Sequence, residues 1–218
     1  MEWQGWPQST WLEMPLARTQ KVSSERWVET AHRVLVEEGI AGVKVDRLAH
    51  RLGVTRGGFY HNFRDREELL DALLHRWKRE CRFLPGLPAS RALADVGAWF
   101  DSAVDRLIVE SGYDHDFDMA VREWARSDER AARAVERSDR ERMGTLQRVF
   151  DALGYSEDEA RVRARVFYYH QIGYYAIGVR ESIAARKRNA HLYIDILCGH
   201  QVMQRVRSAV ARKAKTRA

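Results

Sequence analysis

Apolar residues recur along the chain at the three- and four-residue spacing of amphipathic helices, and no segment alternates like a half-buried strand. One helical segment runs from the Ser23-Ser24 pair to Gly39, where a glycine can end a helix. Another begins at Asp65, which forms a capping box with Glu68. Their apolar positions are Trp27, Val28, Ala31, Val34 and Leu35, then Leu69, Leu70, Leu73, Leu74 and Trp77. The pattern predicts an all-α fold.

Between these two helices, residues 45–63 read VDRLAHRLGVTRGGFYHNF and predict two short helices that cross over a tight turn. Ala49 is small enough to let the second helix approach the first, and Gly53 can take the left-handed conformation where the first one ends. Thr55 is expected to cap the second helix with its side chain. That helix has donors on one face and phenylalanines on the other, which is typical of a recognition helix.

Several features occur together between about Ser24 and Trp77: a glycine after the first helix, the segment LAHRLGVT, the pair Phe59-Tyr60, and EELL at 67–70. In this combination the sequence resembles the DNA-binding domain of the TetR family of bacterial transcriptional regulators. Lys44 departs from the family, whose members usually carry Ser or Thr there, and Gly58 stands where a side chain is common. The resemblance implies a DNA-reading domain followed by a helical effector domain, and usually repression.

Seven residues in and around the predicted turn are candidates for contact with DNA. A guanidinium at Arg56 can donate to guanine O6 and N7 in the major groove, while Tyr60 and His61 are expected to hold phosphates. Arg66 could also reach a phosphate, although an ordinary exposed arginine would give the same pattern. The full set is Lys44, Thr55, Arg56, Gly57, Tyr60, His61 and Arg66.

The segment FLPGLPAS at 83–90 interrupts the helical pattern and predicts a domain boundary. We expect an N-terminal arm at 1–22, a DNA-binding domain at 23–82 and a helical ligand-binding and dimerisation domain at 83–218. Five further helices are predicted at roughly 90–110, 117–127, 128–153, 156–187 and 190–213, which makes about nine in all.

The predicted arm contains three tryptophans but no helical period. Arg18 and Lys21 could lie against DNA, and a solvated leader is the alternative. Met14, rather than Met1, could be the start of translation.

The last two long helical patterns carry apolar and small residues at alternating four- and three-residue intervals. A two-fold homodimer through a four-helix bundle is favoured, because one recognition helix covers only half of an operator. Packing within a single chain is the alternative. The interface candidates are Val166, Tyr169, Gly173, Ala176, Ile196, Gly199, Met203 and Val206.

Aromatic and apolar residues of the second domain predict a cavity for an apolar or aromatic small molecule, although most residues of this kind simply form core. The candidates are Phe100, Val104, Phe117, Val121, Trp124, Phe167, His170 and Tyr174. The loop Tyr113-Asp114-His115-Asp116 is interpreted as an Asp-capped helix start rather than a metal site. We expect no cofactor and no metal.

The composition, with 45% hydrophobic and 31% charged residues, is that of an ordinary globular protein. A net charge of +6 suits a polyanionic partner. No run approaches the ~20 apolar residues of a membrane span, and no secretory leader is present, so we expect a cytoplasmic, nucleoid-associated protein without a membrane partner. Cys81 and Cys198 are expected to be inert thiols.

These observations predict a sequence-specific DNA-binding protein that acts as a homodimer on a palindromic double-stranded DNA operator. The resemblance implies that it is a transcriptional regulator, most simply a repressor that a small-molecule effector releases. An enzyme is not expected, because no GxSxG, HExxH or phosphate-binding glycine loop is present, and catalytic residues are therefore not assigned. The alternatives are a helical protein-interaction adaptor and a transcriptional activator of the same fold.

Overall fold

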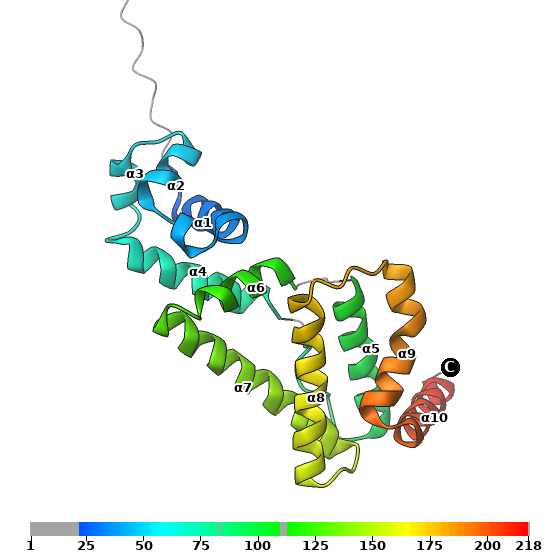
Figure 1. The fold of residues 1–218 in the computed structure, drawn as a ribbon. Coiled ribbons are helices and arrows are strands. Elements are labelled where there is room, and N and C mark those ends of the chain that lie inside the picture. The colour runs from blue at the N-terminus through cyan, green and yellow to red at the C-terminus, as the bar shows by residue number, and fades with distance from the viewer. Residues whose placement is uncertain (1–21, 83, 110–112, 218) are drawn as a thin grey trace, which may run out of the picture.

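The computed structural model describes residues 22–82, 84–109 and 113–217 (Figure 1). Across these residues the chain forms ten α-helices and one short 3-10 helix, and its β pairing is limited to an isolated bridge between Cys81 and Tyr113. The all-α prediction is confirmed. The predicted arm lies outside the described residues, except for Val22, which is buried and therefore belongs to the folded part.

The N-terminal half comprises α1 (Ser24–Glu38), the 3-10 helix η1 (Ile40–Gly42), α2 (Val45–Leu52), α3 (Arg56–Tyr60) and α4 (Arg66–Glu80). Two predicted caps are confirmed, because the side chains of Ser23 and Asp65 accept the N–H groups of Arg26 and Glu68. Gly39 ends α1 with φ at 71°, a conformation that favours glycine. The apolar faces of these helices meet around the fully buried Trp27, Leu35, Leu48, Phe59, Leu69, Leu70 and Leu73.

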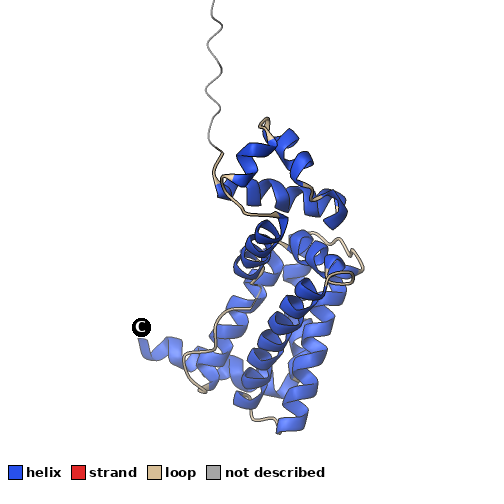
Figure 2. Cartoon of the chain, turned by 90° about the vertical axis from the view of Figure 1, so that its left-hand side faces the viewer, coloured by secondary structure: helices blue, strands red, loops and turns tan. Residues whose placement is uncertain are grey.

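The C-terminal half comprises α5 (Leu93–Val109), α6 (His115–Trp124), α7 (Glu129–Ala152), α8 (Glu157–Ala176), α9 (Ile183–Cys198) and α10 (His200–Arg217). Helices α7 and α8 pack side by side, and α10 packs along α5. Figure 2 shows the helical chain from a second direction. A Cβ at Gly97 in α5 would lie 2.5 Å from a methyl carbon of Val210 and 2.9 Å from one of Val206. The bare backbone of Gly97 therefore permits the close approach of α10.

Two of the predicted helices are broken in the structure. The helix predicted over 156–187 stops at Ala176, and the chain turns through Gly178 at φ 73° before α9 begins. The helix predicted over 190–213 is divided at Gly199, which has φ at 86°. The hydroxyl of Tyr155 donates to the Cys198 carbonyl (2.6 Å) and fills the space where a Cβ of Gly199 would stand. The second half therefore has six helices instead of five.

Helix α6 lies between the two halves of the chain (Figure 1). It contacts α1 and α4 of the N-terminal half and α7 and α8 of the C-terminal half. One continuous cluster of buried side chains runs through both halves. The division of the chain at 83–90 stays a prediction, and both halves share this packed core.

No helix in the described part of the chain is both long enough and apolar enough to cross a membrane.

Candidate nucleic-acid interface and ligand cavity

The turn between α2 and α3 has the predicted geometry. Gly53 ends α2 in the left-handed region with φ at 66°. Helix α3 has five residues, and the ring of its buried Phe59 lies 5.3 Å, centre to centre, from the rings of both Trp27 and Phe63. So short a helix is not stable alone, and this aromatic contact therefore fixes its position.

The outward face of α3 presents the predicted donors. Arg56, Gly57 and Tyr60 are exposed, and so is His61, which follows the last residue of the helix. One terminal nitrogen of Arg56 donates to the Tyr60 hydroxyl (3.3 Å), and its Nε lies 3.3 Å from a carboxylate oxygen of Asp46 in α2. A guanidinium, a phenol and an imidazole beside a bare glycine backbone are groups that bind phosphates and base edges.

Lys44 and Thr55 occupy N-cap positions of α2 and α3, but neither side chain makes a capping bond. The predicted side-chain cap by Thr55 is therefore wrong, and the first turn of α3 is closed by the Gly58 N–H donating to the Thr55 carbonyl (3.0 Å). Lys44 carries no acceptor with which to cap, in agreement with its departure from the family pattern. Both residues are exposed next to the turn.

Arg66 donates hydrogen bonds to the protein's own backbone, and its contact with a phosphate stays a prediction. Its Nε donates to the carbonyl of Val43 (2.7 Å), and a terminal nitrogen donates to the carbonyl of Ile40 (3.3 Å). Asn62, another donor near α3, is turned inward and donates to the carbonyl of Gly58 (2.9 Å). Arg66 thus attaches η1 to the start of α4, a role that depends on carbonyl positions invisible in the sequence.

A buried polar network joins α4 to α6 around the fully buried carboxylate of Asp118. The indole Nε1 of Trp77 donates to one carboxylate oxygen (2.7 Å) and the Tyr113 hydroxyl donates to the other (3.1 Å). The Nε of Arg122 also donates to Asp118 (3.1 Å), and a terminal nitrogen of Arg142 lies 3.6 Å from it. Burial raises the pKa of Tyr113, which keeps its hydroxyl protonated as a donor.

The same arginines extend the network to α7 and α8. Arg122 donates two hydrogen bonds to Asp139 (3.0 and 2.7 Å) and one to the Tyr168 hydroxyl (2.9 Å). Arg142 donates to the carbonyl of Cys81, directly after α4 (2.6 Å). Burial raises the pKa of Tyr168 to about 12. Sequence reasoning missed these residues, because arginine-rich helices usually face solvent. The signal that could have found them is Asp118, which stands four residues before Arg122 on an otherwise apolar face of the helix.

A second polar contact between the halves joins His32 of α1 to Asp114, the N-cap of α6. Their side chains are 3.2 Å apart, and the His32 ring packs 4.0 Å from the ring centre of Phe117. Asp114 accepts the N–H of Phe117 (2.9 Å), so the predicted cap is confirmed. The hydrogen bond from His32 is the main reason that the pKa of Asp114 is lowered. Among the described residues, no cluster of three or more His, Cys, Asp or Glu side chains is placed to hold a metal.

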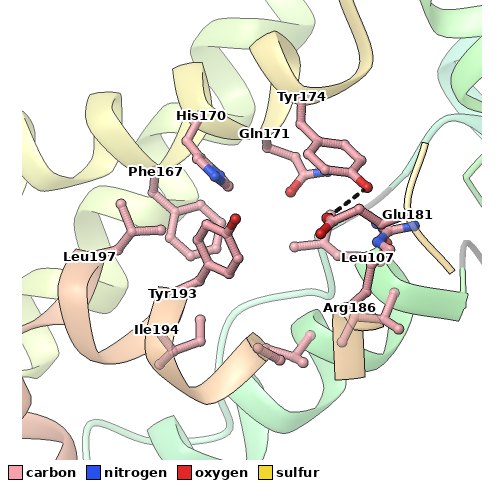
Figure 3. Close-up of a pocket in the computed structure, with 13 residues that line it drawn as sticks. Leu107, Phe167, His170, Gln171, Tyr174, Glu181, Arg186, Tyr193, Ile194 and Leu197 are labelled. Atoms are coloured by element: carbon pink, nitrogen blue, oxygen red, sulfur yellow. Dashed lines mark hydrogen bonds between the residues drawn. The ribbon is translucent and has the colours of Figure 1, made fainter. Parts of the chain in front are cut away.

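The predicted cavity residues lie in three different places. A cavity of about 80 Å³ between α5, α8 and α9 is lined by Val104, Phe167, His170 and Tyr174 (Figure 3). A second one, of about 420 Å³ between α5, α9 and α10, is lined by Phe100 and again by Val104. The three residues on α6 are instead buried in the core, because α6 faces α1 and α4; they are Phe117, Val121 and Trp124. Sequence reasoning missed the polar lining residues Gln171, Glu181, Arg186 and Tyr193.

The predicted interface residues divide into an exposed and a packed group. Four are exposed on α8 and α9: Val166, Tyr169, Ala176 and Ile196. Gly173 lies on the same stretch of α8, and a Cβ there would meet no atom within 4 Å. The three residues at and after the break pack within the chain, Met203 and Val206 in the core and Gly199 against Tyr155. The break turns α10 onto α5, which is why these three do not continue the exposed face.

Comparison with known proteins extends these findings. Residues 28–73 match the family model described as bacterial regulatory proteins, tetR family. An uncharacterized HTH-type transcriptional regulator of Pseudomonas putida, TtgW, is 32% identical over 78 residues, which are 35% of this chain and 58% of that protein. The chain thus matches little more than half the length of this curated relative. These matches are to regulatory proteins rather than enzymes.

Solved structures share the fold. A transcriptional regulator from Rhodococcus sp. Rha1 aligns with a TM-score of 0.52 at 19% identity, over 87% of this chain and 98% of that one. A TetR-family regulator from Marinobacter aquaeolei aligns with a TM-score of 0.53 at 15% identity, over 72% and 79% of the two chains. The two structures share the fold of this chain, and residues 28–73, which hold the helix-turn-helix, match the tetR family of bacterial regulatory proteins.

Proposed function

We propose that the protein is a sequence-specific transcriptional regulator that binds double-stranded DNA through the outward face of α3. The observation that supports this is the exposure of Arg56, Tyr60 and His61 on a short helix whose Phe59 is fully buried. A helix that enters the major groove needs hydrogen-bond donors on its outward face and a packed inner face that fixes its position. Exposed Lys44 and Thr55 would add phosphate contacts that set the register.

The proposed DNA-binding unit is a homodimer on a palindromic operator, joined through α8 and α9. Val166, Tyr169 and Ile196 leave 50%, 59% and 76% of their surface exposed, and large exposed apolar patches mark protein–protein interaction sites. Gly173 offers open backbone in the same region, so that a second helix could approach closely. One α3 covers a half-site only, and two copies are needed for an operator.

The proposed output is repression, relieved when an effector occupies the cavity next to α8. A continuous series of contacts leads from that cavity to α4. The Tyr175 hydroxyl donates to the carbonyl of Leu107 in the cavity wall (3.4 Å), and its ring centre lies 5.3 Å from that of Tyr113. Tyr113 and Trp77 then share the carboxylate of Asp118. An effector that favours the DNA-free arrangement would shift α4, and with it α3.

The test is the affinity of the full chain for the DNA that flanks its own gene, measured by fluorescence anisotropy at several salt concentrations. We expect a palindromic site and an affinity that falls more than tenfold between about 50 and 200 mM salt, since several phosphates are neutralised in each half-site. A smaller salt dependence would contradict the phosphate contacts. Failure to bind any duplex would favour the helical adaptor, and increased transcription on binding would favour the activator.

A further inference from the structure

The cavity between α5, α8 and α9 has a mostly apolar wall, and Figure 3 shows the side chains that converge on it. Phe167 on α8 and Ile194 and Leu197 on α9 form one side, with Leu107 of α5 at the other. Small-molecule sites are typically apolar in this way, with a few polar groups that orient the ligand. The polar groups therefore decide which class of molecule fits.

Gln171 places a buried donor at this wall. Its residue surface is 7% exposed, and its side-chain amide nitrogen has no hydrogen-bond partner among the described residues. The side chain reaches from α8 toward the cavity, next to Tyr174 (Figure 3). Buried donors in native proteins are nearly always paired, so an unpaired one at a cavity wall is expected to bind an acceptor that enters the cavity.

The charged groups at the edge of the cavity are occupied by the protein itself. Tyr174 donates to the carboxylate of Glu181 (3.3 Å), and the guanidinium of Arg186 lies over the Tyr174 ring, 5.1 Å from its centre. Arg186 also donates to the carbonyl of Leu107. Burial lowers the pKa of His170, so its imidazole is neutral at pH 7. The negative charge of Glu181 and the positive charge of Arg186 cancel, so the cavity lining carries no net charge.

We propose that this cavity binds an uncharged, compact molecule with an apolar ring and a carbonyl acceptor, and that the carbonyl accepts from Nε2 of Gln171. The assignment rests on the proposed function, for which it names the class of effector. A hydrocarbon would leave the Gln171 donor unpaired. A carboxylate would lose its hydration beside Glu181, with Arg186 already bound elsewhere.

The size of the site limits the ligand. Its volume of about 80 Å³ is well below the ~300–1,000 Å³ of sites for drug-sized ligands. The second cavity, of about 420 Å³, shares Val104, Ala190 and Ile194 with it. The carbonyl end of a ligand therefore fits the smaller space, and any longer substituent would extend past Ile194 between α5 and α9.

The experiment compares three probes of one size, acetophenone, ethylbenzene and benzoate, by NMR titration of the full chain. We expect acetophenone to bind about fivefold to tenfold more tightly than ethylbenzene, the ratio given by one net hydrogen bond, and benzoate to bind most weakly. In Gln171→Met, an uncharged side chain of similar length, the ratio should fall to within twofold. Gln201→Met, at an exposed position of α10, should keep the wild-type ratio.

Equal binding of acetophenone and ethylbenzene to the wild type, tightest binding of benzoate, or an unchanged ratio in Gln171→Met would each overturn the assignment. The wild-type ratio is decisive even if Gln171→Met fails to fold. A separate anisotropy measurement with operator DNA distinguishes the two proposals. If the protein binds acetophenone selectively but binds no DNA, the proposed function is overturned and the ligand class stands. If it binds DNA but does not discriminate between the probes, the ligand class is overturned and the proposed function stands.

Discussion

The indole nitrogen of Trp77 donates a 2.7 Å hydrogen bond to the carboxylate of Asp118, and both side chains are buried. The bond joins the last turns of α4 to the first turn of α6. Arg122 and Arg142 flank the same carboxylate, so its charge is compensated inside the protein. The contact between the N-terminal and C-terminal halves is therefore polar at its centre and sensitive to the loss of one charge.

Replacing Asp118 by asparagine should lower the free energy of unfolding by about 3–5 kcal/mol, because Arg122 and Arg142 would keep buried charges without this partner. Urea denaturation measures the change. Asp116→Asn, an exposed position two residues earlier, is the control and should stay within about 0.5 kcal/mol of the wild type. A loss below 1 kcal/mol for Asp118→Asn would mean that Asp139 alone balances the arginines.

Arg56→Ala should relax base preference at one position in each half-site, at about 1–3 kcal/mol, since its guanidinium is held on the outer face of α3. Binding to a library of operator variants gives the preference at each position. Arg133→Ala removes the same charge from an exposed position on α7 and should leave the preference unchanged. Equal weakening on every sequence would instead assign Arg56 to a phosphate.

Gly173→Leu should reduce the dimer fraction in sedimentation velocity without destabilising the monomer. A Cβ at Gly173 would meet no atom within 4 Å apart from the backbone of its own helix, and leucine favours a helix over glycine by roughly 0.8 kcal/mol. Any loss of association must then come from a clash with a second copy. Gly144→Leu on α7 is the matched helical control. An unchanged dimer would exclude this part of α8 from the interface.

The contact between His32 and Asp114 should make stability depend on acid pH. Because the folded pKa of Asp114 is lowered, its contribution is fully present above the unfolded value of about 3.9 and is lost as pH falls through the folded value. Urea midpoints between about pH 3 and 6 should therefore fall more steeply for the wild type than for Asp114→Asn, which keeps an acceptor for the Phe117 N–H. His32→Leu should reduce the slope similarly. Parallel curves for all three proteins would refute the contact.

The N-terminal half could be predicted closely because its signals are local. Ser23 and Asp65 cap the helices that follow them, and Gly53 supplies the positive φ of the turn. The C-terminal half could be predicted only in outline. By sequence, Gly199 could lie within a helix or end one. It ends α9 in the structure, where Tyr155, 44 positions earlier in the chain, occupies the space beside it.

The candidate sites divide in the same way. Exposed donors on α3 follow from the period of a helix whose Phe59 must be buried. Phe117 and Trp124 look like cavity residues by type, but α6 turns them toward α1 and α4, and no local pattern specifies that direction. Arg66 is predicted from its position as a phosphate ligand, and the structure adds its hydrogen bonds to two backbone carbonyls, which no local pattern specifies. Long-range packing decides these cases.

The separation of buried and exposed positions within α3 has an evolutionary consequence. Phe59 is the buried residue of this five-residue helix, while the neighbouring positions 56, 57, 60 and 61 face solvent. Substitutions at those four positions remove no buried side chain, so they can accumulate with little loss of folding. A gene duplicate of this regulator could acquire a new operator in a few steps, and the same four positions are where a designed specificity could be grafted.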